Sequence, residues 1–337
     1  MVYHFLTGSY AAPEDVGVCR FSFDPAQGFS LQKGWENFIN PSFLIEHPHH
    51  PVLYTVEETT PEGMVRAWEL QGALLRPLGA LPSGGGSPCH LALSPDGNWL
   101  YVSNYVTGSL SVFALDEQGG LTAMTDLKQH SGQGPNAYRQ EGPHVHCALE
   151  QDGLLRVCDL GTDRIQLYRR QNGKLKAAGS VSMKPGSGPR HLAVHPKLPG
   201  QMYCVAELES SVYRLQQRED TFEIDQALSS LPEGYEGENT GAALHFTGDG
   251  KLLLTSNRGH DSIAVFPVER DGTLGRPVIS PCAAEPRDFA VYDDYVIVGS
   301  QRKNEIRAYR LDRDTLRLTD MGFAAETDCP TCFFRIE

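Results

Sequence analysis

Residues able to do acid–base and anion chemistry stand at two fixed places in a repeated pattern of this sequence. The first place is a constant distance after a proline. It holds Glu57, Asn104 and Asp159, each 16 residues after Pro41, Pro88 or Pro143. Glu207, 18 residues after Pro189, and Asn257 with Arg258 occupy this place in later copies. The second place directly follows the proline and holds His90, His144, His146, Arg190 and Arg287.

These residue types can share the work of opening a carbonyl compound. A carboxylate or an imidazole can accept a proton from water, and histidine suits either proton role near neutral pH. Arginine is a fixed positive charge that can hold an oxyanion, a carboxylate or a phosphate. The sequence contains neither a Gly-x-Ser-x-Gly motif nor a Ser-His-Asp order, so we do not expect an acyl-enzyme.

The elements that must position these residues are short strands. A run of alternating apolar residues, with the period of two that is typical of a strand, occurs seven times. The copies begin at Val18, Val65, Leu110, Ile165, Val212, Ile263 and Ile306, at steps of 43 to 55 residues. Each repeat contains three further strand-like runs. Four strands in each of seven repeats predict an all-β fold, a seven-bladed β-propeller with four antiparallel strands per blade.

The two ends of the chain predict how this ring closes. The chain begins with the second strand of a repeat and ends with the first strand of one. We therefore expect the C-terminal strand, residues 331–337, to join an N-terminal blade built from residues 2–36. A single propeller domain over residues 1–337 follows, because closed all-β architectures often run long as one domain.

Propeller geometry predicts where the polar residues lie. The innermost strand of a blade lines the central channel, and the second strand runs back beside it. Residues just before the first strand and just after the second therefore emerge at one mouth of the channel. Any one of them could instead bond nearby turn backbone, but several charges near one axis are costly unless paired or used. We expect Arg190, Glu207 and Arg258 to converge there, as mouth residues with little core packing.

Composition restricts the partners of the chain. The net charge of −13 argues against nucleic acid and anionic membranes. The start has no signal-peptide pattern, and no apolar run approaches the ~20 residues of a membrane span, so we expect a cytoplasmic protein. The eight cysteines, including the isolated Cys329-x-x-Cys332 pair, are expected to be free structural thiols. Two long segments, 128–141 and 216–239, are either lids over the mouth or disordered loops.

Several segments resemble a known family. They are HSGQGPNAYRQEGPHVH from His130, DLGTDRIQLY from Asp159, GPRHLAVHP from Gly188, YCVAELESSV from Tyr203 and LLLTSNRGHDSIAVF from Leu252. These segments resemble signatures of the seven-bladed lactonase family, which includes bacterial propeller-type 6-phosphogluconolactonases and is similar to fungal carboxymuconate lactonizing enzymes. The resemblance covers essentially the whole chain. It implies an enzyme that acts on lactone rings without a metal or other cofactor.

The resemblance also implies site residues. One histidine, two arginines and a glutamate of the fungal branch correspond to His144 or His146, Arg190, Arg258 and Glu207. Alternation within a strand would put both histidines on one face. The remaining candidates for substrate contacts are His90, Asn104, Asp159, Asn257, Arg287, Arg139 and Glu57. One departure leaves contacts in the sixth repeat open, because Gly241, Ala242 and Ala243 stand where other repeats have proline.

Three functions fit these observations. The first is hydrolysis of 6-phosphogluconolactone to 6-phosphogluconate, a step of the pentose phosphate pathway. The second is another lactone reaction, by a cycloisomerase or a hydrolase of unphosphorylated sugar lactones. The third is a non-catalytic propeller scaffold, which the inward-facing charges disfavour. The expected partner is a small anionic or polyhydroxylated lactone. We expect a monomer or weak homodimer, and no metal, because two fixed positive charges would repel a divalent cation.

Overall fold

A computed structural model describes residues 1–72, 74–219 and 221–336, and every regular element within them is a β-strand. Ala73, Asp220 and Glu337, which fall in predicted strands, lie outside the described residues. The described strands form seven sheets of four, as the repeats predict. The chain divides into two compact units, Met1–Glu36 with Arg190–Glu337 and Asn37–Pro189. A single domain over residues 1–337 stays a prediction.

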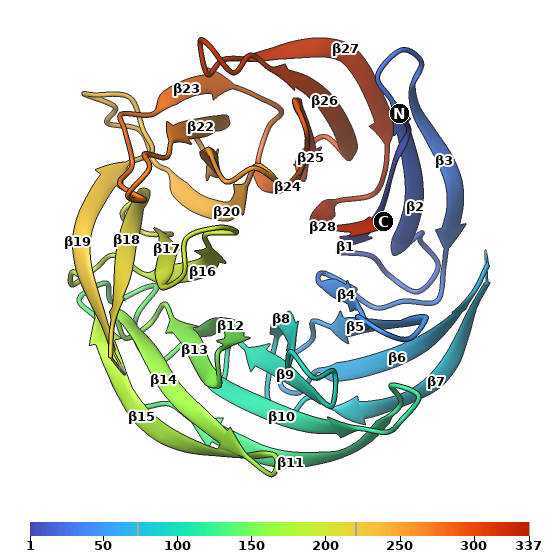
Figure 1. The fold of residues 1–337 in the computed structure, drawn as a ribbon. Coiled ribbons are helices and arrows are strands. Elements are labelled where there is room, and N and C mark those ends of the chain that lie inside the picture. Colours follow the sequence, from blue (N-terminus) through green and yellow to red (C-terminus); the bar gives the residue numbers. More distant parts are fainter. Residues whose placement is uncertain (73, 220, 337) are drawn as a thin grey trace. The chain divides into compact units, whose positions relative to one another are not determined.

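The first unit holds four sheets, one of which joins the two ends of the chain (Figure 1). That sheet has the order β28 (Pro330–Ile336), β1 (Tyr3–Ser9), β2 (Val18–Asp24) and β3 (Gly28–Trp35). His4 pairs with Ile336 and Thr7 with Phe333, which confirms the predicted pairing of the terminal strands. The other three sheets are β16 (Pro189–Val194), β17 (Gln201–Ala206), β18 (Ser211–Arg218) and β19 (Thr221–Ser229); β20 (Thr240–Phe246), β21 (Leu252–Arg258), β22 (Ser262–Pro267) and β23 (Val278–Pro281); and β24 (Pro286–Tyr292), β25 (Tyr295–Ser300), β26 (Glu305–Leu311) and β27 (Leu318–Glu326).

The second unit holds three sheets of the same kind, each with its strands in sequence order. They are β4 (Leu44–Glu46), β5 (Val52–Glu57), β6 (Met64–Gln71) and β7 (Leu74–Pro82); β8 (Pro88–Leu93), β9 (Trp99–Asn104), β10 (Ser109–Leu115) and β11 (Leu121–Gln129); and β12 (Val145–Gln151), β13 (Leu154–Asp159), β14 (Arg164–Gln171) and β15 (Lys174–Ser182).

Apolar residues of neighbouring sheets pack face to face within each unit. Phe5 and Phe21 of the terminal sheet, for example, share a core with Ile297 of β25. Burying such a side chain stabilises the fold by roughly 1.5–3 kcal/mol. The second strand of a sheet is covered on both faces, so β5 and β13 are buried along their whole length. The fourth strand, such as β19, alternates between buried and exposed residues because one of its faces meets solvent.

A bulge marks the start of the innermost strand in several sheets. The register between first and second strand shifts at Pro88/His90 and at Val145/Cys147. It also shifts at Gly241/Leu244 and Pro286/Phe289. A bulge inserts an unpaired residue and re-aims the side chains around it. Strand alternation therefore does not decide which way the residues at these positions point.

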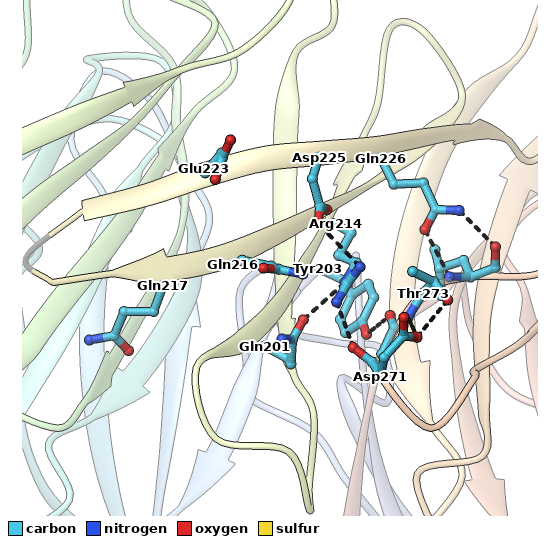
Figure 2. A network of polar contacts seen from close by, with 12 residues as sticks. Gln201, Tyr203, Arg214, Gln216, Gln217, Glu223, Asp225, Gln226, Asp271 and Thr273 are labelled. Atoms are coloured by element: carbon cyan, nitrogen blue, oxygen red, sulfur yellow. Dashed lines mark hydrogen bonds and ion pairs between the residues drawn. The ribbon is translucent and has the colours of Figure 1, made fainter.

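Polar contacts tie β18 to the hairpin after β22, as Figure 2 shows. The guanidinium of Arg214, which is almost fully buried, donates to Gln201 Oε1 at 2.9 Å, to Asp225 Oδ2 at 3.2 Å and to the Asp271 carbonyl at 2.6 Å. The Tyr203 hydroxyl donates to the neighbouring Gly272 carbonyl at 2.5 Å. These bonds fix one sheet of the first unit against the next.

Among the described residues, no helix is long and apolar enough to cross a membrane.

Candidate functional site

Arg190, Glu207 and Arg258 meet in the first unit. Arg190 lies in β16, Glu207 directly follows β17, and Arg258 ends β21. Arg190 Nη1 donates to Glu207 Oε2 at 2.6 Å, and Arg258 Nη2 lies 3.1 Å from the same oxygen. The predicted convergence of these three residues is therefore present. The expectation of exposed mouth residues with little packing is wrong, because Arg190 is only 4% exposed and Glu207 only 2%.

The Gly241–Ala242 step that departs from the repeat completes this ion cluster. Arg258 Nη2 donates to the Gly241 carbonyl at 3.2 Å, and Arg190 Nε donates to the Ala242 carbonyl at 3.1 Å. The Gly241 amide in turn donates to the Glu207 carbonyl at 2.9 Å. A Cβ at position 241 would lie 2.9 Å from Val205 Cγ2, so only glycine allows this approach. The bulge thus aims two carbonyl oxygens at two guanidinium groups.

Charges of both signs act on Arg258. The pKa of Arg258 is lowered to about 10. Burial is the largest cause, and the charges of Arg190 and Arg287 act in the same direction, whereas the charge of Glu207 opposes them. Arg258 still carries its charge at neutral pH. Its Nε is buried and has no hydrogen-bond partner within the described part of the chain. A buried donor without an acceptor is costly.

Arg287 extends the positive charge along the neighbouring strand. It is the second residue of β24, which packs beside β20 and β21. Its guanidinium lies 5.2 Å from the centre of the Tyr10 ring, a cation–π contact. Glu285, whose negative charge raises the pKa of Arg258, forms an ion pair with Arg302 at 3.2 Å.

Asn104 and Asn257, two of the predicted substrate contacts, are fully buried, and each bonds both its own sheet and the end of the preceding sheet. Asn257 Nδ2 donates to the Ser230 carbonyl at 2.8 Å and to Ser262 Oγ at 3.2 Å. Asn104 Nδ2 makes the equivalent bonds to the Ser83 carbonyl and Ser109 Oγ, both at 3.2 Å. These two amides join the ends of three strands, which is the local bonding that the same spacing also allowed.

Asp159 and Glu57 are likewise bonded within the second unit. Asp159 Oδ2 lies 2.8 Å from His130 Nδ1, and Asp159 Oδ1 accepts the His144 amide at 2.9 Å. The other His130 nitrogen lies 3.0 Å from the hydroxyl of Tyr168. Glu57 forms an ion pair with Arg66 at 2.5 Å. Corresponding positions of the repeats therefore have different partners: Asp159 binds a loop, Glu57 binds one arginine of β6, and Glu207 binds two arginines.

Tyr105, which the sequence analysis did not select, brings together three predicted residues of the second unit. The His144 ring stacks on the Tyr105 ring at 4.5 Å, and the His146 ring meets it edge-on at 5.6 Å. Arg139 Nη2 donates to the Tyr105 hydroxyl at 3.2 Å. Its position directly after Asn104, at the end of a second strand, was the available signal.

Two acceptors lie near the ring nitrogens of His144. Its Nδ1 lies 3.0 Å from the Tyr105 carbonyl oxygen, and its Nε2 lies 3.3 Å from Glu141 Oε1. His90, the remaining candidate, has its Nε2 3.5 Å from the Cys147 thiol.

Comparison with known proteins decides the family. The family model described as "Lactonase, 7-bladed beta-propeller" matches residues 4–334. The chain belongs to this family. It is a seven-bladed β-propeller with four antiparallel strands per blade, and it is a lactonase.

Relatives of the lactonase are similar over their whole length. It is 30% identical over 339 residues to the 6-phosphogluconolactonase of Bacillus subtilis, with 96% of each chain covered. A crystal structure of a putative 6-phosphogluconolactonase from Bacteroides fragilis is 26% identical, with a TM-score of 0.92 and 100% and 98% of the two chains covered. The periplasmic gluconolactonase of Pseudomonas aeruginosa is also 26% identical, with a TM-score of 0.92 and 100% and 99% covered.

The two candidate lids of the lactonase are largely ordered by their own contacts. Residues 128 and 129 end β11, and the buried Gln140 donates to the Leu160 carbonyl and to Asp163 Oδ1, both at 2.8 Å. Residues 221–229 of the second segment form β19, which leaves only 230–239 as a loop. Describing the whole of 216–239 as a loop is therefore wrong.

The cysteines of the lactonase form no disulfide bonds. All eight cysteines are free, and six of them are buried. Among the described residues, no group of three histidine, cysteine, aspartate or glutamate side chains could hold a metal ion.

Proposed function

We propose that the lactonase hydrolyses a phosphorylated sugar lactone, 6-phosphogluconolactone, to 6-phosphogluconate. The observation that carries this proposal is that three arginines of the first unit lie close to one another. Arg190 and Arg258 share one carboxylate, Glu207, and Arg287 adds a third guanidinium whose charge acts on Arg258. Arginine is suited to a phosphate because its fork of donors matches the phosphate oxygens. The name of the B. subtilis relative supports the same substrate.

The proposed roles follow from what each residue can do. Arg190 and Arg258 hold an anionic group of the substrate, and Glu207 keeps both guanidinium groups in place. His144 or His146 takes part in proton transfer. Arg287, Arg139 and His90 are the proposed substrate contacts. Asn104, Asn257, Asp159 and Glu57 are placed here as supports of these elements, because their polar atoms bond the protein.

The setting of the proposed reaction follows from its substrate. A phosphorylated lactone is charged and does not leave the compartment where it forms, so we place the enzyme in the cytoplasm and in the pentose phosphate pathway. It needs no cofactor in this scheme, and we propose a monomer or weak homodimer.

A hydrolase of unphosphorylated sugar lactones is the second candidate. The P. aeruginosa relative, named a periplasmic gluconolactonase, favours it. The two candidate functions predict different effects of replacing Arg287. Only a phosphorylated substrate would bind more tightly because of this third guanidinium.

Turnover of freshly prepared phosphorylated and unphosphorylated gluconolactone, corrected for spontaneous hydrolysis, tests the proposal. We expect a higher kcat/KM for the phosphorylated lactone. Arg287→Gln should lower that value by about 10- to 100-fold, since a hydrogen bond to a charged group contributes about 1.5–3 kcal/mol, and should leave the unphosphorylated lactone unaffected. The exposed Arg276→Gln is the matched control. Equal turnover of both lactones, with equal losses in Arg287→Gln, would favour the second candidate.

A further inference from the structure

Hydrolysis of a lactone needs a base for the attacking water, and Glu207 is poorly suited to that task. Its Oε2 accepts from two guanidinium groups, at 2.6 Å and 3.1 Å, deep in the protein. Opposite charges at this distance stabilise the carboxylate as an anion and weaken it as a base. The inference below rests on the proposed function and concerns which group accepts the proton.

His245 and Asp288 form a second polar pair in the first unit. His245 lies in β20 and Asp288 in the adjacent β24. His245 Nε2 lies 2.8 Å from Asp288 Oδ1. The carboxylate also accepts the Phe289 amide at Oδ1 and the Phe333 amide at Oδ2, both at 2.8 Å. Three elements therefore hold Asp288 in place, and its side chain is almost fully buried.

The bonds of Asp288 decide the tautomer of His245. A carboxylate that accepts two backbone N–H groups is an ionised acceptor, so Nε2 of His245 must carry the hydrogen in their shared bond. Nδ1 of the neutral ring then bears the lone pair. Nδ1 has no hydrogen-bond partner in the described ranges, and the side chain of His245 is 40% exposed. This is the arrangement of an oriented base with its free nitrogen open to solvent.

A pocket of about 310 Å³ adjoins the pair. Its lining includes His245, Phe246, Phe289, Phe333, Phe334 and Arg335. Such a volume is at the lower end of small-molecule sites, and mostly apolar walls around a few polar groups are usual for them. Arg335, whose guanidinium stacks over Tyr292 at 4.6 Å, adds a positive charge to the rim.

The pocket and the arginine cluster share the same strands. In β20, the Gly241 and Ala242 carbonyls bind the arginines, and His245 follows three to four residues later. At about 3.3 Å per residue this is roughly 10–13 Å. In β24, Arg287 directly precedes Asp288. In a closed lactone ring the phosphate and the carbonyl carbon are closer together than this backbone distance, so the substrate would reach both places through the long side chains of the arginines and the ring of His245.

We propose that His245 is the general base of the lactonase, that Asp288 positions it, and that the substrate lies with its phosphate at the arginines and its lactone carbonyl at the pocket. Nδ1 of His245 takes a proton from water while the water oxygen bonds to the carbonyl carbon. The tetrahedral adduct then breaks the bond between that carbon and the ring oxygen. The proton passes to the ring oxygen, which yields the open hydroxy acid. Water and lactone are consumed in equal amounts.

Steady-state kinetics of His245→Gln tests this assignment. Glutamine can still donate to Asp288 but cannot accept the proton, so kcat should fall by roughly 10²- to 10⁴-fold with little change in KM. Asp288→Asn should also lower kcat, because an amide can donate to Nε2 and would favour the opposite tautomer. Arg258→Gln should instead raise KM for the phosphorylated lactone. The exposed His49→Gln is the control and should match the wild type.

The tautomer itself gives a readout independent of turnover. Nitrogen chemical shifts of His245 in the wild-type protein should correspond to hydrogen on Nε2, even if a variant fails to fold. Hydrogen on Nδ1 would overturn the proposal, as would a wild-type kcat in a folded His245→Gln protein. If the wild-type protein hydrolyses no lactone, the proposed function falls and this inference falls with it. Turnover in the wild type with no loss in His245→Gln removes the base assignment alone.

Discussion

Arg190 Nη1 and Glu207 Oε2 lie 2.6 Å apart, and both side chains are almost completely buried. The same carboxylate oxygen lies 3.1 Å from Arg258. One carboxylate oxygen therefore contacts two buried guanidinium groups. Catalysis and stability are coupled at this point, because the residues that would hold substrate also hold the protein.

Replacing Glu207 by glutamine should destabilise the protein as well as reduce turnover. The change leaves two buried guanidinium groups without a counter-charge, and breaking a buried pair costs about 3–5 kcal/mol. Urea unfolding measures the loss of stability. Glu233→Gln, which removes one partner of an exposed ion pair with Arg276, should cost less than about 1 kcal/mol. Equal stability of the two variants would show that the buried pair adds nothing to the fold.

Gly241→Ala should impair both stability and activity. Its Cβ would lie 2.9 Å from Val205 Cγ2 and 3.3 Å from the Ala206 carbonyl oxygen. Forcing an extra methyl group into a packed site typically costs about 1–3 kcal/mol, and a shift of β20 would move the carbonyls that bind Arg190 and Arg258. Gly248→Ala is the control, since a Cβ there has no described atom within 4 Å. A Gly241→Ala protein with normal melting temperature and KM would contradict this explanation of the departure from the repeat.

Arg214→Met should lower stability while leaving turnover unchanged in the folded fraction. Arg214 is buried and bonds Gln201, Asp225 and the Asp271 carbonyl (Figure 2). Without Arg214 these acceptors lose their hydrogen bonds. Each acceptor that stays buried then lowers the free energy of unfolding by about 1–3 kcal/mol. Arg218→Met, in an exposed pair with Glu223, should have little effect on the melting temperature. Loss of kcat in Arg214→Met below its melting temperature would mean that the network also positions the site.

Stability should fall steeply as the pH rises above ~10. Burial raises the pKa of Tyr168 and of Tyr203 to about 12. A tyrosine in the unfolded chain ionises near pH ~10, so the folded state binds more protons between these values. The stability that these two tyrosines contribute is fully present below this pH window and is lost as the pH rises through it. Urea unfolding on both sides of the window measures the loss, and Tyr203→Phe should make it smaller. Tyr138→Phe, at a fully exposed site, should not change the pH dependence.

The positions of the strands could be predicted from local sequence patterns. Alternating apolar residues and turn signals recur with a period that hydrogen bonding and burial impose on every sheet, so the four strands of each repeat could be predicted without coordinates. The pairing of β1 with β28 followed from which strand stands at each end of the chain. Arg190, Glu207 and Arg258 could be selected together because they occupy equivalent ends of neighbouring strands.

What each of these residues does could not be read in the same way. Asn104, Asp159 and Glu207 have nearly the same spacing from a proline, yet the first two bond the segment that follows the preceding sheet and only Glu207 holds two arginines. The difference lies in the partners that packing brings to each position, since Glu207 meets Arg190 of β16 and Arg258 of β21. The His245–Asp288 bond joins residues from separate repeats. Sequence alone determined which residues stand at strand ends, and only the tertiary structure decided their partners, since partners come from packing between sheets that no local pattern records.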